Sequence, residues 1–93
     1  MRNLLSLNGR IFVYLRNRNI SELFLKNAEA EGFTFSDGVK PTERHDSDIF
    51  ALHHDRTINY VGSVGHMAFQ CAADGIVRVD YEKYLAGAEN YIL

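Results

Sequence analysis

The most regular pattern of apolar and polar positions predicts a helix over residues 20–31. Its apolar residues recur at the spacing that places them on one helix face: Ile20, Leu23, Phe24 and Ala28. Asn19 is suited to cap the first turn, with Glu22 three residues later as its capping-box partner. Gly32 follows at the position where helices often end in a left-handed residue.

The apolar run 11–15 predicts a strand that is covered on both faces and lies inside its sheet. Segments 48–53 and 57–61 predict a hairpin, because apolar and polar residues alternate in the second of them. The three residues between these segments would form the turn. Loop 39–46, which contains the proline and several charges, is predicted to form no regular element.

Towards the end of the chain, residues 76–79 predict a short strand. Asp80 would then cap a helix over 81–86 that Gly87 ends. Residues 66–73 fit a helix or a strand equally well. At 93 residues the chain is expected to form one domain, 1–93, of the α+β class. We expect a small, mainly antiparallel sheet with the main helix packed on one face and a short C-terminal helix.

Composition narrows the possible functions. The net charge of −2 is evenly spread, which makes nucleic-acid binding unlikely despite a local group of arginines: Arg2, Arg10, Arg16 and Arg18. The single cysteine, Cys71, excludes an internal disulfide and is predicted to be buried among apolar neighbours.

The chain has no apolar run of membrane-spanning length or signal-peptide type, so a cytoplasmic protein without membrane contact is expected. A sheet this small leaves edges that pair easily, and we therefore expect a homo-oligomer.

All four histidines fall within 22 residues: His45, His53, His54 and His66. Compact metal-ligand spacings are absent, and neighbouring side chains on a strand point to opposite faces. A metal would require His45, His53 and Asp48 to converge over a distance. The sequence therefore predicts no metal and no cofactor, and a histidine-dependent or metal-dependent hydrolase is kept as an alternative.

Two segments could bind an anion. If residues 66–73 are helical, the turn before them would present backbone N–H groups to a phosphate, with Ser63, Gly65 and His66 beside it. The same glycines are also ordinary turn residues. In loop 37–46, Lys40, Arg44 and His45 could hold an anionic group. Internal ion pairing with the acidic residues of the same loop is the alternative there.

Three segments resemble short uncharacterised proteins of Firmicutes and of their phages or mobile elements: Asp37–His45, Ile58–Phe69 and Val79–Tyr84. The resemblance covers roughly residues 10–86. It carries no activity and no site residues. By analogy with other small phage-borne domains, it implies a binder that interferes with host machinery, an anti-defence type of role.

The sequence favours a small non-enzymatic binding module. Its partner would be a host protein or a small anionic ligand such as a nucleotide, held by the six residues named for the two anion-binding segments. The alternatives are the hydrolase already described and a nucleic-acid-associated regulator. No catalytic residue is assigned.

Overall fold

The computed structural model describes the backbone of residues 1–93 and every side chain except that of Arg2. The elements follow one another in the order η1 (Arg2–Ser6), β1 (Arg10–Tyr14), α1 (Arg18–Ala30), β2 (Thr34–Phe35), η2 (Pro41–Glu43), β3 (Ile49–Leu52), β4 (Thr57–Tyr60), α2 (Ser63–Gln70), β5 (Ile76–Asp80) and α3 (Tyr81–Leu85). The elements η1 and η2 are short 3₁₀ helices, and η2 lies within the segment predicted to have no regular structure. The α+β class is confirmed.

The five strands form one mixed sheet in the order β2-β4-β3-β1-β5. The pairs β1–β3 and β3–β4 are antiparallel, whereas β1–β5 and β2–β4 are parallel. The prediction of a mainly antiparallel sheet is therefore wrong, although the β3–β4 hairpin and the inner position of β1 are confirmed. The error arose because residue patterns identify strands without showing which strands lie side by side.

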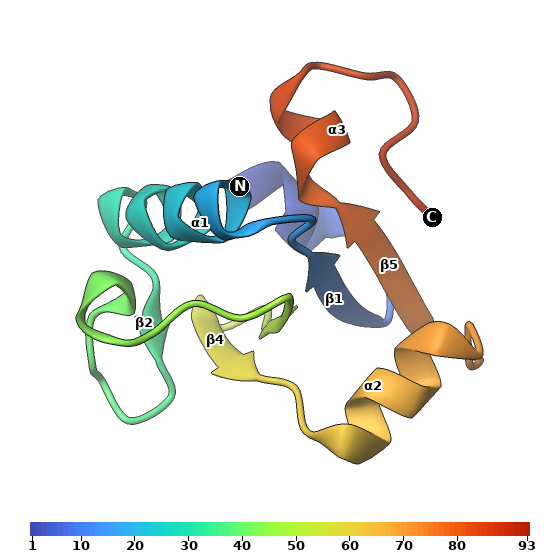
Figure 1. Ribbon diagram of the computed structural model, residues 1–93, viewed down its shortest axis with the longest axis horizontal. Coiled ribbons are helices and arrows are strands. Elements are labelled where there is room, and N and C mark those ends of the chain that lie inside the picture. Colours follow the sequence, from blue (N-terminus) through green and yellow to red (C-terminus); the bar gives the residue numbers. More distant parts are fainter.

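The strands alternate their side chains between two unequal cores. Ile11, Val13, Phe50 and Leu52 belong to the larger core, which also contains side chains of α1, η1 and α3. In this core Phe24 of α1 stacks on Phe50 with 5.4 Å between ring centroids. On the opposite face, Phe12 and Ile49 pack with Phe69 of α2 in a much smaller core. Figure 1 shows α1 and α3 on one side of the strands and α2 on the other.

Helix α1 begins at Arg18, two residues earlier than predicted. Asn17, not Asn19, is the N-cap, and its side-chain oxygen accepts a hydrogen bond of 3.0 Å from the Ile20 N–H. Glu22 pairs with Arg18 instead of reaching back to the cap. The helix ends as predicted, because Gly32 has a positive φ of 85°.

The buried face of α1 is also rotated from the predicted one. Ser21, Phe24, Leu25 and Ala28 are buried, whereas Leu23 is 40% exposed. The shift follows from Ser21, whose hydroxyl donates to the Ser47 carbonyl at 2.7 Å and accepts from the Ser47 N–H at 3.2 Å. Ser21 is therefore buried because the Ser47 backbone satisfies its hydroxyl, although a polar residue at this position is expected to be exposed.

The ambiguous segment 66–73 is helical, since α2 covers most of it. Cys71 lies just after this helix and is exposed, so its predicted burial is wrong. Of the α2 residues only Phe69 is buried. The helix is therefore attached to the sheet through a narrow contact.

The outer edge of β5 is occupied by the end of the chain. The N–H of Leu93 donates to the Arg78 carbonyl, and the N–H of Asp80 donates to the Tyr91 carbonyl, each at 2.8 Å. The opposite edge strand, β2, is two residues long. The sheet therefore has little exposed edge strand with which a second copy could pair. Within the described part of the chain, no helix has the length and apolar character needed to cross a membrane.

Candidate functional site

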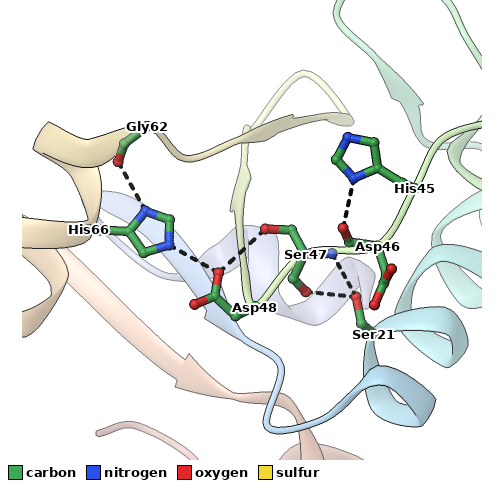
Figure 2. Close-up of polar contacts among 7 residues, drawn as sticks. All are labelled: Ser21, His45, Asp46, Ser47, Asp48, Gly62 and His66. Carbon is green, nitrogen blue, oxygen red and sulfur yellow. Dashed lines mark hydrogen bonds and ion pairs between the residues drawn. The ribbon is translucent and has the colours of Figure 1, made fainter.

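The turn before α2 is tied to the start of β3 by a histidine and a carboxylate. His66 Nε2 lies 3.0 Å from Asp48 Oδ1, and His66 Nδ1 lies 3.0 Å from the Gly62 carbonyl oxygen (Figure 2). The hydrogen bond to Asp48 and the contact with Gly62 raise the pKa of His66. The same hydrogen bond lowers the pKa of Asp48. The pair is therefore an ion pair at mildly acidic pH.

The backbone around Asp48 is held by hydrogen bonds to two other parts of the chain. The main-chain oxygen of Asp48 accepts a hydrogen bond of 2.7 Å from the Leu15 N–H next to β1. Ser47 beside it is bound through both backbone groups to the buried Ser21 hydroxyl of α1 (Figure 2). The Asp48–His66 contact thus links α2 to a segment that is hydrogen-bonded both to α1 and to the residue after β1.

This arrangement differs from the predicted anion cradle. His66 faces an acid of the protein itself, and both of its ring nitrogens already have partners. Ser63 is exposed at the first position of α2 and makes no described side-chain contact with His66. Gly65 has a packing role: a Cβ there would lie 2.3 Å from Val61 Cγ1 and 3.7 Å from Phe12 Cε2.

The other predicted anion-binding residues are separated by their contacts. Arg44 pairs with Asp37 and also lies over the Phe35 ring, with Cζ 4.8 Å from the centroid. His45 stacks on Tyr60 with 4.6 Å between ring centroids, while Lys40 is exposed. The internal-pairing alternative therefore describes Arg44. A groove of about 330 Å³ does lie between α1 and segment 42–46, and Arg44 and His45 line it.

The charges in that groove are nearly balanced. Arg18, Lys26 and Arg44 bring positive charge, and Glu22 and Asp46 bring negative charge. Arg44 is paired with Asp37, which lies outside the lining. Arg18 is already paired with Glu22. The groove therefore gives a free anion little net attraction.

The residues of the predicted metal site do not converge, and two of the N-terminal arginines have partners within the protein. Among the described residues, no three His, Cys, Asp or Glu side chains lie together in a way that could hold a metal ion. His45, His53 and Asp48 each contact a different partner. Of the N-terminal arginines, Arg16 pairs with Asp80 and Glu82, and Arg18 pairs with Glu22.

A cavity that the sequence did not indicate lies on the sheet face beside α2. It measures about 390 Å³, and a second cavity of about 140 Å³ shares part of its lining. Residues common to both are Arg10, Phe12, Ala51 and His53. The larger cavity is also lined by three residues of the α2 region: Gly62, Val64 and Gly65. Its volume falls in the usual range for small-molecule sites, about 300–1,000 Å³.

The polar side chains that line this cavity include hydrogen-bond donors. The Arg10 guanidinium lies over the Phe12 ring, with Cζ 5.4 Å from the centroid, and no described side chain forms an ion pair with it. Asn59 Nδ2 lies 3.0 Å from His53 Nε2, and the Ser36 hydroxyl donates to Asn59 Oδ1 at 2.9 Å. With the Asn59 amide donating to Nε2, neutral His53 carries its proton on Nδ1. None of the described residues lining either cavity is acidic.

One signal in the sequence could have pointed to this cavity. Alternate side chains of β1, and of β3 with the residue that follows it, share the face opposite the main core. These side chains are Arg10, Phe12, Ala51 and His53. Finding it required knowing that β1 and β3 are adjacent. Comparison of the chain with protein-family models, with curated proteins and with solved structures gave no match in any of the three.

Proposed function

We propose that this protein is a non-enzymatic binding module that holds a small organic anion in the cavity between the sheet and α2. The observation that carries the proposal is the Arg10 guanidinium, which lies in a cavity without an acidic residue in its described lining. A guanidinium binds carboxylate and phosphate oxygens in pairs, and this one has no such partner among the described side chains.

The rest of the lining indicates what the anion carries. Phe12, Ala51 and Val61 give the cavity an apolar floor, and Val64 of α2 gives it an apolar wall. The His53 ring adds a second donor near Arg10. The ligand is therefore an anion with an apolar or aromatic body, either a carboxylate or a phosphate ester.

The contacts of the nucleophile and base candidates favour binding over catalysis. His66 has acceptors at both ring nitrogens and no described contact with Ser63 or Cys71. A general base must lie within hydrogen-bond reach of the group it deprotonates. If the resemblance to phage and mobile-element proteins reflects origin, the role would be to sequester such an anion from the host.

The proposal is tested by titrating the protein with benzoate, adenosine monophosphate and the neutral adenosine while recording amide NMR spectra. We expect the two anions to shift the signals of residues 10–12, 51–53 and 59–65, and adenosine to have a much weaker effect. The relative effect of the two anions distinguishes a carboxylate site from a phosphate-ester site. Equal effects of adenosine and its monophosphate, or shifts confined to segment 42–46 and α1, would refute the assignment.

A further inference from the structure

Helix α2 is held against the sheet mainly at its two ends. At the C-terminal end, Arg78 Nη1 donates to the Phe69 carbonyl at 3.2 Å, and the Phe69 ring is buried. Two other residues of α2, Val64 and Met67, are 81% and 64% exposed. At the N-terminal end, His66 contacts Asp48, and Gly65 lies close to Val61 in the preceding turn and to Phe12 of β1.

The contacts of His66 require two protons on its ring. Both neighbouring atoms, the Gly62 carbonyl oxygen and Asp48 Oδ1, are hydrogen-bond acceptors (Figure 2). A neutral imidazole has one N–H and can donate to only one of them, whereas the imidazolium ion donates to both. Loss of one proton therefore ends the ion pair with Asp48, which is the contact that joins His66 to another element, and leaves one of the two ring nitrogens without a proton to donate.

The residues affected by that loss also line the proposed binding cavity. Gly62, Val64 and Gly65 form its α2 wall, and Gly62 is the residue whose carbonyl His66 contacts. We infer that the His66–Asp48 pair is a pH-sensitive latch that holds α2 in place and thereby sets the affinity of the cavity for its ligand. This inference rests on the proposed function and concerns the regulation of the same site.

The charged groups around the latch support its assignment to this pair. Asp48 is the charged side chain that contacts the His66 ring among the described residues. Arg78, the charged residue of β5 that contacts α2, binds the opposite end of the helix. The Asp48 hydrogen bond raises the pKa of His66, so the ring keeps both protons to a higher pH than a free histidine does.

The test uses benzoate, whose carboxylate stays ionised across the range, and measures its Kd by NMR at about pH 6 and about pH 8. Three proteins are compared: the wild type, His66→Gln and Asp48→Asn. We expect the Kd of the wild type to rise by about threefold or more at the higher pH, because the latch then loses a contact. In both variants the Kd should change much less with pH.

Three results would overturn the latch. The first is a wild-type Kd that is the same at both pH values while benzoate still binds, which leaves the proposed function intact. The second is an undiminished pH dependence in His66→Gln, which would show that the effect does not arise from His66. The third is an absence of binding at either pH, which removes the proposed function together with the latch.

A measurement without ligand tests the pair itself. The NMR titration midpoint of the His66 ring should lie above the ordinary histidine pKa of about 6.5 in the wild type, and lower in Asp48→Asn. Equal midpoints in the two proteins would show that Asp48 does not hold the imidazolium, and the latch would fail whatever the ligand data show.

Discussion

The guanidinium of Arg10 lies 5.4 Å from the centroid of the Phe12 ring and is left without an anionic partner among the described side chains. Arg16 and Arg18 each have a carboxylate partner. An arginine stacked on an aromatic ring keeps its hydrogen-bond donors at the ring's edge available to another group. This difference supports the proposed role of Arg10 in binding an anion.

The corrected start of α1 gives a prediction with a built-in control. Asn17→Ala should lower the free energy of unfolding by about 1 kcal/mol, because the Ile20 N–H loses its acceptor. Asn19→Ala should have little effect, since Asn19 lies within the helix and is exposed. Urea unfolding of both variants measures the difference. A larger loss for Asn19→Ala would restore the cap predicted from the sequence.

A second prediction concerns the close packing of α2 on the sheet. Gly65→Ala should destabilise the protein by about 1–3 kcal/mol, because its Cβ would lie 2.3 Å from Val61 Cγ1. Gly62→Ala is the matched control, since a Cβ at Gly62 meets no atom within 4 Å. Benzoate binding should weaken in Gly65→Ala more than in Gly62→Ala. Similar stability and binding in the two variants would contradict the packing described for this turn.

Stability should depend on pH through the His66–Asp48 pair. The pKa of folded His66 is raised, so its contribution is complete below the unfolded value and is lost as the pH rises through the folded value. The lowered pKa of Asp48 means that its contribution is lost instead as the pH falls through that value. Between about pH 6 and about pH 8, the urea midpoint of the wild type should fall more than that of His66→Gln. Parallel curves for the two proteins would show that the pair adds no pH-dependent stability.

Features set by neighbouring residues could be predicted from the sequence. Gly32 ends α1 in a left-handed conformation as expected, and the side chain of Asp80 caps α3 by accepting a hydrogen bond of 3.3 Å from the Lys83 N–H. The β3–β4 hairpin was predicted for the same reason, since its strands and turn are continuous in the chain. Each of these depends on residues only a few positions apart.

Features that depend on distant contacts could not be predicted in this way. The parallel β1–β5 pair joins residues separated by most of the chain. The partner of His66 is Asp48, 18 positions earlier, and this contact replaces the expected open anion cradle. The proposed binding cavity needs Arg10 and His53 on one face, and the β1–β3 pairing brings them there. In each case the residue types are evident from the sequence, but their neighbours are set by contacts between distant segments of the chain.

The measurement that tests the account most directly is benzoate binding by Arg10→Gln and Arg18→Gln, which lose the same charge at two different places. Amide NMR spectra of both variants first establish that each is folded. We predict that Arg10→Gln weakens binding by about tenfold or more, because a charge-assisted contact is lost, while Arg18→Gln binds like the wild type. If the two variants bind benzoate equally well, Arg10 does not hold the anion and the proposed site is wrong.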